Sequence, residues 1–211
     1  NYTFSISGGQ TRTGENIDAK TALKNATVFS CVSIVAASVA QLPWGVNRKT
    51  NNTITSVDHP ALALLRRPNP IQSEYEFKHN IIVDLLTHGN AYVLKVVTKS
   101  GKIIELIPLD ALKIEITRSA SGKRTYTFDK ANVYDENQII HIRDFANHTT
   151  EGLSKVLQCA NLVAIDNQID YQMADIFRNG SALSGVVTIP GEVTKEAGDA
   201  LASAWKTKFG P

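Results

Sequence analysis

The chain has 211 residues, of which 43% are hydrophobic, and this is enough for at least one packed core. Its net charge is only +2, with 22 basic and 20 acidic residues, whereas a protein that binds DNA through bulk positive charge is usually far more basic. No apolar run approaches the roughly 20 residues that a membrane-spanning helix needs.

The first segment, NYTFSISGGQTRTGEN, is polar and glycine-rich, and it predicts a flexible arm over residues 1–20. A helix follows, because apolar residues recur at i, i+3, i+4 and i+7 spacing within residues 28–39. Asn25 or Thr27 can cap its start. Pro43 ends it, because proline has no N–H group and clashes with the preceding turn.

Three further elements are predicted before the sheet. WGVNRKTNNTITSV alternates around Asn51-Asn52 and predicts a hairpin, and HPALALLRRPNP predicts a short helix bounded by prolines. Ser73 and Glu76 form a capping-box pattern at the start of a longer helix. Gly89 ends that helix, since glycine adopts the left-handed conformation without steric cost.

Short strands are predicted directly after Gly89, at AYVLKVVT, IIELIPL, LKIEITR, RTYTFD and QIIHIRD. They indicate an antiparallel meander between two helical regions. The predicted fold class is therefore α+β, with an antiparallel sheet domain flanked by helices.

A long helix is predicted at Leu153–Arg178, which contains no glycine or proline and would span about 40 Å. Because of this length, it is expected to project from the sheet domain or to line an interface. The strand SGVVTIP and the helix TKEAGDALASAWKTKF, capped by Thr194, come next. A terminal strand–helix pair has little to pack against, so the sequence is expected to be a shortened form of a longer chain.

Metal and nucleotide sites are not expected. The histidines are scattered, and neither H-E-x-x-H nor C-x-x-C occurs, so no metal or other cofactor is predicted. Gly9 and Gly14 have the spacing of a P-loop, but Glu15 stands where the lysine should be. Cys31 and Cys159 lie in apolar helical patterns and are predicted to be reduced, buried thiols.

Asp84 and His88 are four residues apart on one helical face, where a carboxylate could orient a histidine base. The sequence places no nucleophile near them. A polar pairing, or His88 near the negative end of the helix, explains the two residues equally well. His88-Gly89-Asn90 is best interpreted as a helix end that leads into a strand.

Seven segments, in this order, cover nearly all of the chain after about Thr21: VFSCVSIVAASVAQLPWGV, HPALALLRRPNPIQSEYEF, LLTHGNAYVLKV, LIPLDALKIEI, IIHIRD, EGLSKVLQCANLVAID and FRNGSALSGVVTIPGEVTKEAGDALASAWKTKFG. Their order and wording resemble the portal proteins of tailed bacteriophages. Each motif alone is weak, but seven in the family order are specific. One difference is Lys155, which replaces a proline that family members often have near the start of the long helix.

The resemblance implies a ring, usually of twelve subunits, at one capsid vertex, through which double-stranded DNA is packaged and later ejected. Residues 21–151 would form the wing, residues 152–180 a projecting stem helix, and residues 181–211 part of a strand–helix clip. A second stem helix, a tunnel loop and a crown, which the family has, would be missing from this chain.

The implied partners are other copies of the chain, the large terminase packaging motor, head-completion or adaptor proteins, the major capsid protein and scaffold. DNA would pass through the channel without sequence specificity. The protein would lie at the portal vertex of the virion after assembly in the host cytoplasm. It would not be an enzyme, since ATP hydrolysis belongs to the motor. Two alternatives are another phage adaptor ring and a hydrolase that uses Asp84 and His88.

Three sets of candidate site residues follow. The long helix would meet its neighbours through Val156, Ala160, Val163 and Ile169. Asp166 and Asp170, one turn apart, belong either to a solvated face or to a negative strip that faces the channel. The final helix would bind a partner through Lys195, Trp205, Lys206 and Lys208, unless Trp205 packs onto the neighbouring strand.

Overall fold

The structure, a computed structural model, describes residues 2–4, 9–146, 151–178 and 194–209. The chain divides into two compact units, Asn1–Val163 and Ala164–Pro211. Within the described ranges, no helix is both long and apolar enough to cross a membrane.

The longer helices of the first unit begin and end where the sequence predicts. The unit contains α1 (Ala19–Ala22), α2 (Ala26–Ala40), α3 (Pro60–Arg66), α4 (Glu74–His88) and α5 (Lys155–Gln158). Asn25 caps α2 by accepting hydrogen bonds from two N–H groups of the first turn, at 3.0 and 3.1 Å. Ser73 and Glu76 form the expected capping box of α4, and Gly89 ends that helix with φ of +75°.

The strands form two main antiparallel sheets. One has the order β1 (Tyr2–Phe4), β8 (Ile114–Arg118), β9 (Arg124–Phe128), β10 (Asn132–Asp135); the other has the order β11 (Ile139–Arg143), β6 (Asn90–Val97), β7 (Ile103–Leu109). Two smaller ribbons are β2 (Gly9–Gln10) with β3 (Asn16–Ile17), and β4 (Asn47–Thr50) with β5 (Thr53–Ser56). Asn51 and Asn52 turn the β4–β5 hairpin with φ of +46° and +68°, which confirms the predicted turn.

The α+β fold class is confirmed, but the single meander is wrong. β7 and β8 belong to different sheets, because the 3₁₀ turn η1 (Ala111–Lys113) carries the chain from one sheet to the other. β11 then returns to pair with β6. Strand β10 was not predicted. The pairing of strands depends on contacts between distant segments, which the spacing of apolar residues does not reveal.

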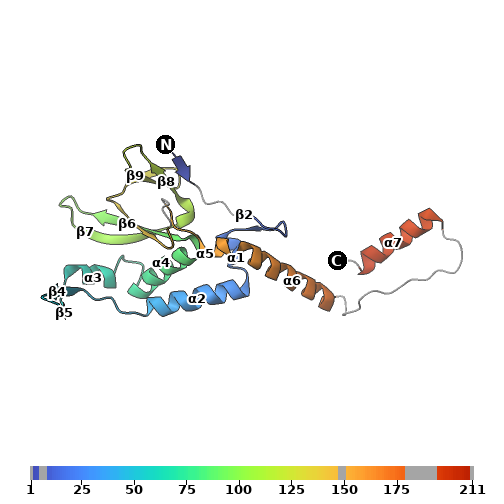
Figure 1. The fold of residues 1–211 in the computed structure, drawn as a ribbon, viewed down its shortest axis with the longest axis horizontal. Helices are drawn as coiled ribbons and strands as arrows, with labels where there is room; N and C mark the ends of the chain where they lie inside the picture. The colour runs from blue at the N-terminus through green and yellow to red at the C-terminus, as the bar shows by residue number, and fades with distance from the viewer. Residues whose placement is uncertain (1, 5–8, 147–150, 179–193, 210–211) are drawn as a thin grey trace. The chain divides into compact units, whose positions relative to one another are not determined.

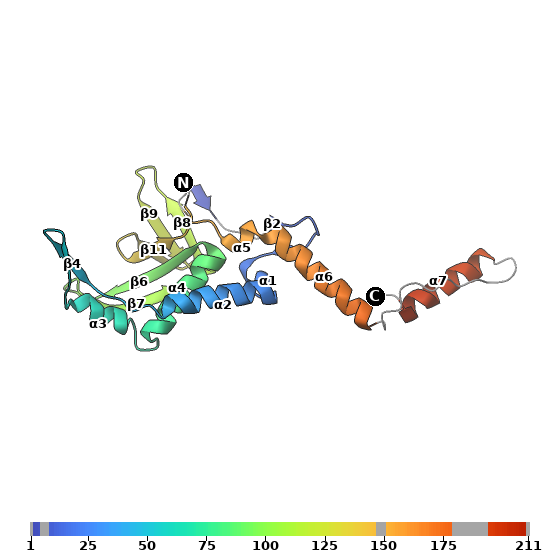
Figure 2. The ribbon, with the colours of Figure 1, turned by 60° about the horizontal axis from the view of Figure 1, so that its bottom comes forward.

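The first unit has two apolar cores, and strand β6 contributes side chains to both, because successive side chains of a strand point to opposite faces. Tyr92 packs between the two sheets with Ile116 and Tyr126. Ala91 and Val93 face the helical side, in a cluster with Phe77, Ile81 and Leu106. Figures 1 and 2 show α4 running along the β6–β7 pair, and α2 packs against α4.

A buried lysine ties the end of α2 to α4. Lys78 is only 3% exposed, and its ammonium group donates to Glu74 Oε1 at 2.5 Å and to the backbone carbonyl of Leu42. The same group lies 4.8 Å from the centre of the Trp44 ring. Burial of a charge is tolerated here because it is paired, hydrogen-bonded and placed over an aromatic face.

Two predictions for the first unit need correction. The segment expected to be an arm is partly built into the fold, since β1 pairs with β8 and Ile17 and Ala19 are buried. Cys31 and Cys159 are both exposed, although buried thiols were expected. Each follows an apolar pattern, but the described residues of the first unit do not cover the helix face that carries it.

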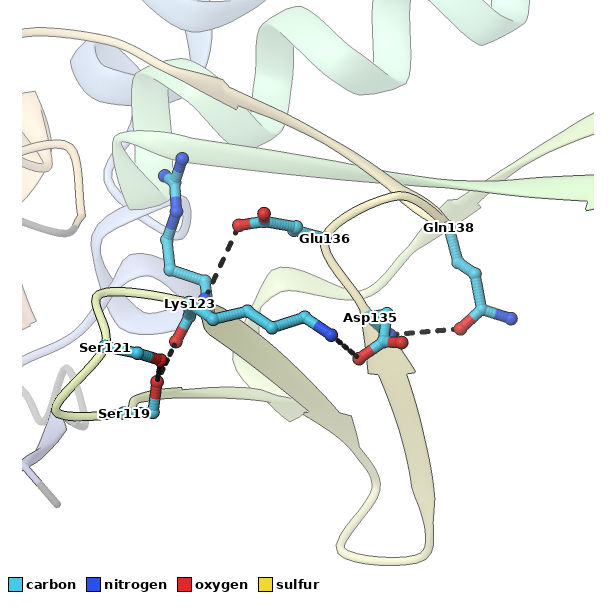
Figure 3. A network of polar contacts seen from close by, with 7 residues as sticks. Ser119, Ser121, Lys123, Asp135, Glu136 and Gln138 are labelled. Atoms are coloured by element: carbon cyan, nitrogen blue, oxygen red, sulfur yellow. Dashed lines mark hydrogen bonds and ion pairs between the residues drawn. The ribbon is translucent and has the colours of Figure 1, made fainter.

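Polar contacts join the β8–β9 turn to the β10–β11 turn (Figure 3). Lys123 pairs with Asp135 at 3.3 Å, and the Arg124 N–H donates to Glu136 at 3.5 Å. Both partners of the ion pair are partly exposed, so the pair contributes no more than about 1 kcal/mol. The network therefore orients two surface turns.

The predicted long helix is interrupted. Helix α5 ends at Gln158, Cys159 takes a non-helical conformation (φ −96°, ψ 7°), and α6 runs over Ala160–Arg178. The Cys159 N–H is shared between the carbonyls of Lys155 and Val156, at 3.3 and 3.1 Å, which tightens the last turn of α5. The final helix, α7, covers Lys195–Phe209. The predicted strand at 184–190 lies outside the described residues.

Candidate functional site

A buried joint connects the end of α4 with the start of α5. The Asn90 side chain, 1% exposed, makes four hydrogen bonds at this joint. Its Oδ1 accepts from the Gly152 N–H at 2.7 Å and lies 3.0 Å from His141 Nε2. Its Nδ2 donates to the backbone carbonyls of His88 and Gly152, at 3.0 and 3.1 Å. One amide thus satisfies groups from three separate segments of the chain.

Two glycines let these segments approach. A Cβ atom added to Gly152 would lie 2.0 Å from the Gly89 carbonyl oxygen, and one added to Gly89 would lie 2.4 Å from the Leu153 carbonyl carbon. Ser154 then caps α5: its Oγ donates to the Thr87 carbonyl at 2.5 Å and accepts from the first turn of α5 at 3.1 Å. The joint therefore fixes the position of the start of α5 against the end of α4.

His141 is a fixed partner in this joint. Its ring stacks on Tyr92, with centroids 4.5 Å apart, while Nε2 meets Asn90. Burial, with the nearby charges of Arg143 and Arg124, lowers the pKa of His141 to about 3. The imidazole is therefore neutral near pH 7, and it serves as a hydrogen-bonding group of constant charge.

The predicted termination at His88-Gly89-Asn90 is confirmed, but the role of Asn90 was missed. The Gly–Asn pair alone indicates only a helix end. Its partners, Gly152 and His141, lie 62 and 51 residues further along the chain. A second glycine, Gly152, two residues before the capping Ser154, was the one available signal.

The Asp84–His88 pair does not form a catalytic arrangement. Burial, followed by the charge of Asp110, raises the pKa of Asp84 to about 7, and burial lowers the pKa of His88. Both residues lie in the described part of the chain, where no hydrogen bond joins their side chains. His88 and Glu151 line a cavity of about 90 Å³, and among the described residues its lining includes no serine, threonine or cysteine.

Within the described residues, helix α6 presents an exposed apolar face. Its exposed apolar residues at four-residue spacing form what we call the α6 stripe: Ile165, Ile169, Met173 and Phe177. Side chains four apart lie in one row along a helix, so they offer a continuous ridge to a partner. Phe177 is the most exposed of the four, at 68%.

The residues predicted for the long helix divide into two groups. Val156 and Val163 are mostly covered within a single chain, at 6% exposure each, so only a small part of either side chain is open to a neighbour. Ile169 is 53% exposed and belongs to the α6 stripe, while Ala160 is half-buried. Asp170 is exposed and Asp166 half-buried. The roles proposed for Ala160, Ile169 and the two aspartates therefore stay predictions, and the periodicity could not separate self-covered from free positions.

On α7, Lys195 is exposed and Trp205 is 40% exposed. The side chains of Lys206 and Lys208 lie outside the described residues. In the described ranges, no group of three or more histidine, cysteine, aspartate or glutamate side chains could hold a metal ion. The predicted docking role of this helix stays a prediction.

Comparison with known sequences identifies relatives of this chain. A family model described as phage portal protein matches residues 26–211. The chain is 25% identical over 188 residues to the portal protein of Enterobacteria phage HK97, covering 86% of this chain and 44% of that protein. It is 26% identical over 200 residues to an uncharacterized protein of Rickettsia bellii, covering 88% of this chain and 51% of that protein. The chain thus spans about half the length of these curated relatives.

Solved structures share the fold. An HK97 family phage portal protein from Corynebacterium diphtheriae superposes with a TM-score of 0.62 at 15% identity, covering 98% of this chain and 65% of that one. A chain from the neck of a native gene transfer agent (GTA) particle, computed with C12 symmetry, gives a TM-score of 0.66 at 20% identity, covering 97% of this chain and 56% of that one. At these identities, the likeness concerns the fold alone.

Proposed function

This chain belongs to the phage portal protein family, and we propose that it is part of a portal subunit that assembles into a ring at one capsid vertex. The α6 stripe carries this proposal, because a row of exposed apolar side chains calls for a covering partner and neighbouring subunits supply one. The net charge of +2 is compatible with double-stranded DNA that slides through the ring during packaging and ejection.

The finer assignments follow the family. We propose twelve subunits, a number that the C12 symmetry of the similar GTA neck supports. Residues 21–151 act as the wing, residues 152–180 as the stem and residues 181–211 as the beginning of the clip. The partners are the large terminase, head-completion or adaptor proteins, and the capsid protein with its scaffold. The ring lies in the virion after assembly in the host cytoplasm.

Electron microscopy of the purified full-length protein in negative stain tests the ring. We expect channelled rings for the unmodified protein, and mostly dispersed subunits for Ile169→Asp, because a carboxylate in an apolar interface loses its hydration. The matched control is Ile54→Asp on the β4–β5 hairpin, where isoleucine is 66% exposed and rings should persist. A compact monomer at every protein concentration would refute the proposal.

We also propose that the protein has no enzymatic activity of its own. Two observations on the described residues support this: no hydrogen bond joins the side chains of Asp84 and His88, and no serine, threonine or cysteine lines the cavity beside His88. ATPase and nuclease assays on purified rings should stay at the level of the buffer. Turnover that disappears in His88→Ala would favour the hydrolase alternative instead.

A further inference from the structure

An open apolar groove lies in the first unit, outside the buried joint. Its volume is about 260 Å³, and its walls come from α2 on one side and from α5 and the first turn of α6 on the other. Leu86 of α4 contributes from between them. The walls include Val28 and Val35 of α2, Val156 of α5, and both cysteines of the chain. We call this space the α2–α5 groove.

Helix α2 has the composition of a covered helix. Its sequence, ATVFSCVSIVAASVA, contains no charged residue. The described residues of the first unit cover only part of it, since Phe29, Ile34 and Val35 are all more than 40% exposed. A helix that is apolar on all sides is normally buried. The exposed side of α2, next to the groove, is therefore expected to be covered by a surface outside the first unit.

We propose that the α2–α5 groove receives the α6 stripe of a second copy of this chain. The inference rests on the proposed ring and names the two surfaces that would meet in it. The stripe is a ridge of side chains four apart, which fits a groove between helices. The groove lies in the first unit and Ile165–Phe177 in the second, so each chain carries a donor surface and a different acceptor surface.

Two different surfaces that bind each other make a head-to-tail interface. Such an interface leaves one donor and one acceptor free in every open assembly, and it is satisfied only when the ring closes. A twofold dimer would instead need the stripe of each copy to enter the groove of the other at the same time. Apart from Thr27 and Lys155, whose ammonium group pairs with Asp144, the groove is lined by apolar side chains and the two thiols, so its match to the stripe is apolar.

The native cysteines provide the test, because the only two in the chain, Cys31 and Cys159, both line the groove. Maleimide labelling of full-length protein should be at least about tenfold slower in rings than in subunits dispersed by dilution, since labelling would require the neighbour to leave. Single Cys31→Ser and Cys159→Ser variants assign the protection to each thiol. In dispersed Ile169→Asp, both thiols should react at the rate of free subunits.

A cross-link identifies the occupant. Ile169→Cys in a Cys31→Ser background should form covalent dimers and larger ladders with a short bismaleimide. The same variant with Cys159→Ser, and Ile54→Cys in the Cys31→Ser background, should not. If the thiols of rings reacted at the rate of free subunits, the proposed role of the groove would be wrong, while the proposal that the protein forms a ring would stand. Protected thiols without the cross-link would mean a different occupant and also overturn it. Absence of rings would remove the proposed function and this inference together.

Discussion

Asn90→Ala should lower the free energy of unfolding of the first unit by about 3–5 kcal/mol, although Asn90 is buried and touches no partner molecule. The side chain is 1% exposed and makes four hydrogen bonds. A neutral hydrogen bond contributes about 1 kcal/mol net, and a buried group that is left without a partner costs about 1–3 kcal/mol. The substitution orphans the buried N–H of Gly152 and one nitrogen of His141, so the cost exceeds that of the lost bonds alone.

Urea unfolding, followed by circular dichroism at one fixed protein concentration, measures this cost. The matched control is Asn132→Ala at the exposed start of β10, which should change stability by no more than about 0.5 kcal/mol. Asn90→Asp separates hydrogen bonding from volume, because it keeps the size but turns a carboxylate toward the carbonyls of His88 and Gly152. If Asn90→Ala cost no more than the control, the joint would not hold the two segments together.

Gly152→Ala should destabilise at least as much as Asn90→Ala in the same assay, because its Cβ would lie 2.0 Å from a backbone oxygen. Asp84→Asn should be more stable than the unmodified protein by about 1–2 kcal/mol at pH 8, after allowance for partial exposure. The folded-state pKa of Asp84 is raised to about 7, so the charged carboxylate destabilises the fold at high pH and the neutral acid does not. The stability gain of Asp84→Asn should therefore shrink as pH falls and vanish near pH 4. A gain that does not change with pH would contradict the raised pKa of Asp84. Charge reversal at Lys206 and Lys208 should leave rings intact and weaken binding of the packaging motor at low salt. The control, charge reversal at Lys99 and Lys102, should not weaken motor binding. Equal motor affinities of the two double variants would remove the α7 lysines from the docking site.

The sequence by itself determined the features that depend on neighbours within a few residues. The cap at Asn25, the capping box at Ser73 and the end of α4 at Gly89 were all predicted correctly. The Asn51-Asn52 turn was predicted in the same way. Each of these features depends on a hydrogen bond or a backbone angle within one turn of the chain, so a few neighbouring residues are enough to predict it. The order of seven segments also indicated the family.

Only the tertiary structure decided which segments meet. Asn90 finds Gly152 across 62 residues, and Lys78 is buried because Leu42 and Trp44 come to it from another part of the chain. Periodicity predicted apolar faces but not their covers, so it treated Val163, buried in one chain, and Ile169, half exposed, as equivalent. The prediction that Cys31 and Cys159 are buried was wrong for the same reason, because periodicity does not show what covers an apolar face. An apolar pattern states that a face avoids water, and only the packing shows whether the same chain or another molecule covers it.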